Sequence, residues 1–175
     1  MPVLREIRAD SNHWVGARGA LILLFWIDRI DPIVCRNLPR IAREVARGLT
    51  NQRVGVLSVA LPSAKAPSME ARQALAAVIR DSEPSIASIA VVREGQGFVA
   101  STAASIMVGI QMLARSTKPH KAFTRLDDAV RWLRDGIGDS FGTADSVEVL
   151  VEVVQRQRSA LLQPRSLKPT PSLRA

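Results

Sequence analysis

The sequence predicts an α/β fold: a mixed, mainly parallel sheet with flanking helices, followed by one appended C-terminal helix. Two observations lead to this fold class. From residue 53 onward, apolar runs of strand length alternate with amphipathic helical stretches, which is typical of parallel strands joined by right-handed crossovers. The N-terminal third reads as strands joined by short turns, which can pair antiparallel. With 175 residues and 47% hydrophobic content, the chain has the size and apolar content of one domain.

The first elements are three strands and a helix. The strands are expected over 3–8, 13–19 and 20–27. The third is a continuous apolar run, as in a central strand covered on both faces. Asp31 followed by Pro32 is a good helix start, with the Asp as cap and the Pro at the first helical position. Pro39 lies inside the helical pattern, so it should kink the helix or mark its true beginning.

The remaining elements are alternating strands and helices up to residue 136, and the alternation ends there. We expect strands over 53–61, 85–92 and 120–123, and helices over 68–82, 98–116 and 125–136. The predicted organisation is a domain over 1–136, a linker over 137–143, an amphipathic helix over 144–162 and a disordered basic tail over 163–175. In the appended helix, Asp145 and Glu148 have the spacing of a capping box. Because an isolated helix of this length is marginal in water, it must cover the body or a partner.

Composition argues against several functional classes. The single cysteine, Cys35, excludes an internal disulfide and a cysteine-based metal cluster. The charged start MPVLREIRAD does not look like a secretory signal, so we expect a cytoplasmic protein. The longest uncharged stretch, 95–114, holds too many polar and glycine positions for a membrane span. We also expect no cofactor.

The net charge of +8 is concentrated at the C-terminus. The 21 residues from Gln155 carry five basic and no acidic side chains, which leaves 19 basic and 16 acidic residues in the rest of the chain. Aromatic residues make up only 4% and do not interleave with basic clusters. This pattern favours a solvated basic tail over a nucleic-acid interface.

No residue set meets the requirements of catalysis or metal binding. His13 and His120 are far apart in sequence, and neither has a second ligand two to four residues away. A pair assembled only by folding stays open at this point. Asp127 and Asp128 fall in the first turn of a predicted helix, where the helix dipole favours acids, and adjacent helical residues do not share a site. We therefore predict no catalytic residues and no metal site.

Two loops are candidate binding elements. Gly95 and Gly97 lie between a predicted strand and helix in a G-x-G-x-x-A pattern, which is either an anion-binding turn of the dinucleotide type or an ordinary glycine-rich turn. Ser63 and Ser68 lie between the predicted strand over 53–61 and the start of the predicted helix over 68–82, where a phosphate would meet free backbone N–H groups. The alternative for Ser68 is an ordinary helix cap.

The order of these elements resembles the STAS superfamily, and most closely its SpoIIAA-like type, which is also similar in topology to lipid-binding Sec14 domains. The resemblance rests on SMEARQAL, IASIAVV and above all KAFTRLDDAVRWL, which looks like a closing F-x-x-x-x-x-A-x-x-W-L pattern. It covers residues 3–136. It implies a non-enzymatic, partner-binding module. In anti-sigma-factor antagonists of this superfamily a serine in an Asp-Ser-Ser/Thr-Gly element is phosphorylated. Here Ser68 is the nearest positional match and Ser63 the second, but that core motif is absent.

We therefore expect a regulatory or scaffolding protein that acts through protein–protein contacts. The contact would be the loop around Ser68 or the appended helix. The chain could also form a homodimer through that helix. A second hypothesis is a module that binds a small apolar ligand or lipid beside the predicted helix over 98–114, whose Ser, Thr and Met side chains could line a pocket. The third is a nucleotide-binding enzyme that uses Gly95 and Gly97.

Overall fold

A computed structural model of the chain describes residues 3–50, 52–80, 84–93, 119–137 and 146–163. Within these residues lie six strands and four helices. The strands are β1 (Arg5–Ala9), β2 (His13–Arg18), β3 (Leu21–Trp26), β4 (Val54–Ala60), β5 (Ile86–Arg93) and β6 (His120–Phe123). The helices are α1 (Pro32–Ala46), α2 (Met69–Arg80), α4 (Leu126–Ile137) and α5 (Val147–Leu162). The predicted helix over 98–116, most of the predicted linker and the tail from 164 lie outside the described residues.

The six strands form one sheet in the order β1-β2-β3-β4-β5-β6. The pairs β1–β2 and β2–β3 are antiparallel, and the pairs β3–β4, β4–β5 and β5–β6 are parallel. The prediction of a mixed, mainly parallel sheet is confirmed. Because the meander comes first and the strand–helix–strand units follow, the carboxyl ends of β3, β4 and β5 lie at the same edge.

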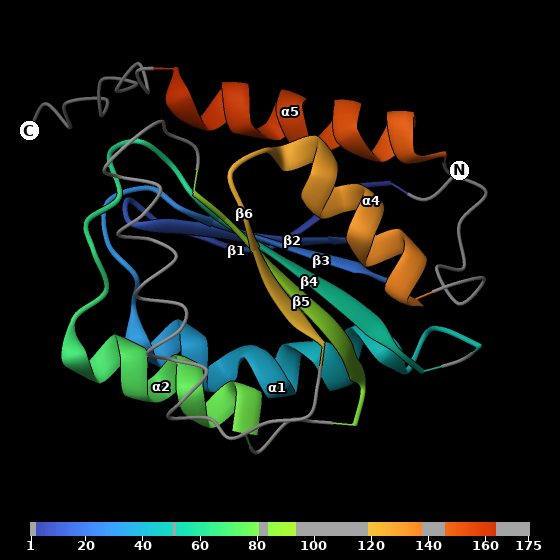
Figure 1. Cartoon of the computed structure of the whole chain (residues 1–175), viewed down its shortest axis with the longest axis horizontal. Coiled ribbons are helices and arrows are strands. Elements are labelled where there is room, and N and C mark those ends of the chain that lie inside the picture. Colours follow the sequence, from blue (N-terminus) through green and yellow to red (C-terminus); the bar gives the residue numbers. More distant parts are fainter. Residues whose placement is uncertain (1–2, 51, 81–83, 94–118, 138–145, 164–175) are drawn as a thin grey trace, which may run out of the picture.

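Helices cover both faces of the sheet (Figure 1). On one face, α1 and α2 pack on a core that includes Leu24, Trp26 and Val56. On the other face, α4 and α5 pack on a core that includes Leu23 and Leu57. Successive residues of a strand point to opposite faces, so both β3 and β4 bury their whole length between two layers of helices. This explains why the run over 20–27 is apolar at every position.

Helix α1 begins where the sequence predicts. The Asp31 carboxylate accepts a hydrogen bond of 2.7 Å from the Ile33 N–H, and Pro32 occupies the first turn. The helix runs to Ala46 with Pro39 inside it, so Pro39 does not mark the helix start.

The appended helix α5 packs on the sheet and on α4. Val147, Leu150 and Val154 are buried in the same core as the inner side of α4. The helix cap is Ser146, whose hydroxyl accepts from the Val149 N–H at 3.4 Å, so the predicted capping role of Asp145 is wrong by one residue. The sequence predicts that this helix covers either the body of the protein or a partner, and in the structure it covers the body. No helix among the described residues is long and apolar enough to cross a membrane.

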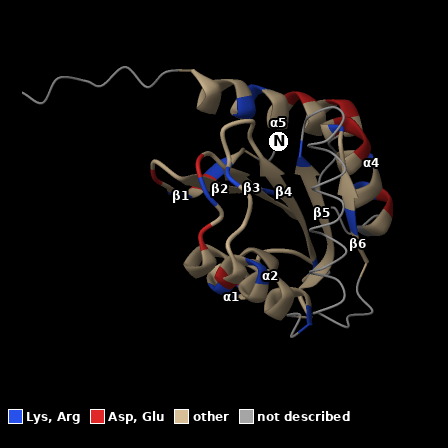
Figure 2. Cartoon of the chain, turned by 60° about the vertical axis from the view of Figure 1, so that its left-hand side comes forward, with Lys and Arg blue, Asp and Glu red and all other residues tan. Residues whose placement is uncertain are grey.

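Charges on the outer helices are mixed in sign. Figure 2 shows basic and acidic residues interspersed along α4 and α5. Between the two helices, Arg131 lies 3.9 Å from Glu148, and within α5, Arg156 lies 2.6 Å from Glu152. Neither helix therefore presents a uniformly basic face of the kind that nucleic-acid binding uses.

Candidate functional site

The candidate site lies at the carboxyl ends of the parallel strands, where ligands and partners of open α/β sheets most often bind. The loop from β4 to α2 crosses this edge and is held to the residues that follow β3. The Leu61 N–H donates to the Trp26 carbonyl at 3.0 Å, and the Lys65 N–H donates to the Asp28 carbonyl at 2.7 Å. The Ser63 hydroxyl donates to the carbonyl of Ile27. These contacts fix the position of Ser63 and of the loop around it.

Ser68 is the cap of α2. Its hydroxyl oxygen accepts from the Ala71 N–H at 3.2 Å, and its carbonyl accepts from the Arg72 N–H at 2.9 Å. The capping alternative for this residue is confirmed. The Ser68 side chain is exposed, so capping leaves it accessible at the surface.

Exposed apolar side chains flank this loop. Ile33, in the first turn of α1, is 54% exposed, and Met69, the first residue of α2, is 65% exposed. An ion pair links the N-terminal parts of the two helices, with Arg36 Nη1 3.2 Å from Glu70 Oε1. A second ion pair joins Lys65 Nζ to Asp28 Oδ1 at 3.1 Å. We call Ile33, Met69 and the two ion pairs the helix-start patch.

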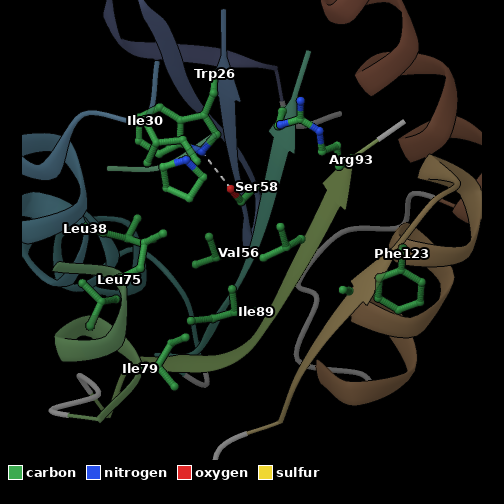
Figure 3. Close-up of a pocket in the computed structure, with 15 residues that line it drawn as sticks. Trp26, Ile30, Leu38, Val56, Ser58, Leu75, Ile79, Ile89, Arg93 and Phe123 are labelled. Carbon is green, nitrogen blue, oxygen red and sulfur yellow. Dashed lines mark hydrogen bonds between the residues drawn. The ribbon is translucent and has the colours of Figure 1, made fainter. Parts of the chain in front are cut away.

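An apolar cavity of about 80 Å³ lies beneath the loop, between the sheet and helices α1 and α2 (Figure 3). Trp26, Val56 and Ile89 line it from the strands, and Leu75 and Ile79 line it from α2. Its polar feature is a hydrogen bond of 2.9 Å from the Trp26 indole Nε1 to the Ser58 hydroxyl oxygen. Both residues are buried, so this bond satisfies the indole donor inside the core.

Arg93 places a positive charge at the edge of the cavity. It is the last residue of β5 and is partly buried. Its Nη2 donates to the Ala64 carbonyl at 3.2 Å, which ties β5 to the loop that carries Ser63. Phe123 also lines the cavity, and its ring packs against Trp132 in a tilted arrangement, at a centroid distance of 5.6 Å.

The titratable groups in the core have pKa values set by burial. His13 is fully buried, and desolvation lowers its pKa, although the Asp10 carboxylate opposes that shift. Asp10 Oδ1 lies 3.0 Å from His13 Nδ1, but out of line for a hydrogen bond. Burial raises the pKa of the Cys35 thiol to about 12, so this cysteine is protonated and unreactive near neutral pH.

The sequence candidates for chemistry are not brought together. His13 begins β2 and His120 begins β6, four strands apart in the sheet, which corresponds to about 19 Å at the usual strand spacing. Among the described residues, no three His, Cys, Asp or Glu side chains form a group that could hold a metal ion. Gly95 and Gly97 lie outside the described residues, so the anion-binding turn stays a prediction.

Comparison of the chain with known protein families, with curated proteins and with solved structures found no match. The structure itself defines the class of the protein, which is an α/β domain with a six-stranded mixed sheet and flanking helices.

Sequence reasoning missed the cavity, Arg93 and the helix-start patch. The cavity is lined from several strands and two helices, so no local pattern marks it. Met69 and Ile33 read in the sequence as ordinary members of apolar helical stretches. Their only signal was position: Met69 directly follows the cap of α2, and Ile33 lies two residues after the cap of α1.

Proposed function

We propose that this protein is a non-catalytic regulatory or scaffolding module that acts by binding a partner protein. The observation that carries the proposal is the helix-start patch. Ile33 and Met69 are large, exposed apolar side chains in the first turns of two neighbouring helices, and the ion pairs Arg36–Glu70 and Lys65–Asp28 lie on the same helices and on the loop that leads to α2. Apolar anchors within a polar rim are the usual composition of a protein–protein contact.

Rigidity of the patch adds support. Capped helix starts and the Arg36–Glu70 ion pair hold the first turns of α1 and α2, and backbone hydrogen bonds hold the loop between β4 and α2. A contact surface that is already ordered loses little side-chain and loop freedom when a partner binds. The loop alternative for the contact is thereby favoured over α5, whose apolar stripe is covered by the sheet.

The resemblance to the STAS superfamily supports the same class of function. The described elements follow the order on which the resemblance rests from β1 to β5 and again in β6 and α4, while the predicted helix over 98–116 between them lies outside the described residues. The closing stretch KAFTRLDDAVRWL forms β6 and the start of α4. Ala129 and Leu133 of that stretch are fully buried against the sheet. A phosphorylated Ser68 or Ser63 would add charge at the edge of the patch, which is how such a contact could be switched.

A photo-cross-linking side chain at position 69 tests this proposal. Introduced in cells, it should capture a defined protein that mass spectrometry identifies and that binds the purified chain. The same cross-linker at Leu162, which is 43% exposed at the end of α5, is the matched control. Capture of a binding partner from position 162 but not from 69 would move the contact to α5, and self-capture there would support the predicted homodimer.

A second candidate function is binding of a small apolar ligand or lipid, and the cavity beneath the loop favours it. Its wall is almost wholly apolar, and Arg93 lies at the edge as a counter-charge for an acidic head group. Native mass spectrometry of the purified protein tests this candidate. A bound lipid that is lost when Ala60 is changed to Leu would support it, since the larger side chain narrows the cavity. Protein that carries no ligand, together with a melting temperature that fatty acids do not change, would contradict it.

A further inference from the structure

The end of α1 and the starts of β4 and β5 lie at the opposite end of the sheet (Figure 1). A second concave surface lies there. Its volume is about 450 Å³, and its lining includes Arg43, Arg47 and Arg53 together with Gln52 and Ser85. We call it the arginine groove. It shares no residue with the helix-start patch or with the apolar cavity.

Local structure brings these arginines together. Arg43 and Arg47 are four residues apart at the end of α1, so their side chains leave the same side of the helix. Gln52 has a positive φ of 49°, which turns the chain back towards β4 and places Arg53 directly before that strand. The Val54 N–H donates to the Ser85 carbonyl at 2.7 Å, which fixes the start of β4 beside the start of β5.

The charges of two of these arginines are uncompensated by the rest of the described chain. Arg36 and Arg40 of the same helix each have a carboxylate partner, Glu70 at 3.2 Å and Glu44 at 3.6 Å. Within the described residues, no such ion pair is formed by Arg47 or Arg53. The helix dipole accounts for Arg47, because a cation is favoured at a helix C-terminus. It does not account for Arg53, which belongs to no helix.

We infer that the arginine groove binds a small phosphorylated compound. Guanidinium groups recognise phosphate oxygens through paired hydrogen bonds, and two arginines without a carboxylate partner among the described residues line this one hollow, which suits a group with at least two negative charges. The size of the groove fits a small molecule. A nucleic-acid strand is disfavoured because the described residues that line the groove include no aromatic side chain to stack on bases.

Isothermal titration with pyrophosphate at low salt tests this inference. The wild-type chain should bind, and the R47Q/R53Q variant should bind at least about tenfold more weakly, since it loses two charged hydrogen-bonding groups. The matched control is R40Q, which removes an arginine from the same helix outside the groove and should bind like the wild type. Binding that falls equally in R40Q would mean that only overall charge matters and would overturn the assignment.

Two further measurements complete the test. Asp81 and Glu83 precede Pro84 in the sequence. If pyrophosphate binds only to a D81N/E83Q variant, the chain's own acids neutralise the groove and the inference is wrong. If a single-stranded oligonucleotide binds more than tenfold more tightly than pyrophosphate with the same dependence on Arg47 and Arg53, a polymer is the ligand and the small-molecule assignment is wrong. Absence of any binding to the wild type also overturns it.

Discussion

The Trp26 indole N–H donates a hydrogen bond of 2.9 Å to the Ser58 hydroxyl, across the buried face that β3 and β4 turn towards α1 and α2. The bond links the two central strands beside the apolar cavity. Loss of the hydroxyl would leave the indole donor buried without a partner.

Ser58→Ala should therefore lower the free energy of unfolding by about 1–3 kcal/mol, the cost of an unsatisfied buried donor. Urea denaturation followed by tryptophan fluorescence measures it. Ser88→Ala is the matched control: Ser88 is also buried, on the neighbouring strand, but its hydroxyl has no hydrogen-bond partner among the described residues. Equal losses in the two variants would show that the Trp26–Ser58 bond contributes nothing specific.

Gly16 is required by close packing in the antiparallel part of the sheet. A Cβ at this position would lie 2.2 Å from the Trp14 ring and 2.8 Å from the Arg5 carbonyl oxygen. The ring cannot move away freely, because its Nε1 donates to Glu6 at 2.7 Å. We expect Gly16→Ala to destabilise the fold by about 1–3 kcal/mol, as overpacking does. Gly48→Ala, where the nearest atom is 3.7 Å away, should change the urea midpoint little; if both variants behave alike, the packing explanation fails.

Buried His13 makes stability depend on pH. Its pKa is lowered by burial in the folded state, whereas in the unfolded chain it returns to about 6.5. The unfolded state therefore binds more protons below that value, and stability should fall as the pH drops from 7 to 5. When urea midpoints are measured at a series of pH values between 7 and 5, His13→Gln should remove the part of the fall in stability that is due to His13. An identical slope in the variant would assign the effect to other groups.

Asp10 should act in a lower pH range. Burial alone would raise the pKa of this carboxyl, but hydrogen bonds from the Asn12 and His13 N–H groups outweigh it and hold the pKa below its usual value. Stability from these bonds is present above the unfolded pKa and is lost as the pH falls through the folded one. Asp10→Asn should flatten acid unfolding below about pH 4. Unchanged acid unfolding would show that these bonds do not stabilise the fold.

Helix α5 should be part of the folding unit rather than a detachable arm. Leu150 is fully buried between α5 and the sheet, so Leu150→Ala should cost about 2–5 kcal/mol. Val149→Ala, on the exposed side of the same turn, should be nearly neutral. A single cooperative unfolding transition for both variants is expected. A separate early transition for α5 would contradict this docking.

Much of the fold could be predicted because its local signals agree. The Asp31–Pro32 start and the all-apolar third strand matched the structure, and so did the alternation after residue 53 as far as the described residues follow it, in β4, α2, β5, β6 and α4. The cap of α5 was misplaced because Asp145 and Ser146 are both good caps, and sequence does not decide between adjacent ones. The sites were not predictable, because the cavity and the arginine groove exist only where several distant elements meet.

The central claim is that the helix-start patch binds a partner protein. Its most direct test is the affinity of the cross-linked partner for purified wild-type chain and for the I33E/M69E variant. Both side chains are exposed, so the variant should fold normally, as circular dichroism can check. We predict at least about tenfold weaker binding, because a charge at an apolar anchor is costly to bury. An unchanged affinity in a folded variant would contradict the claim.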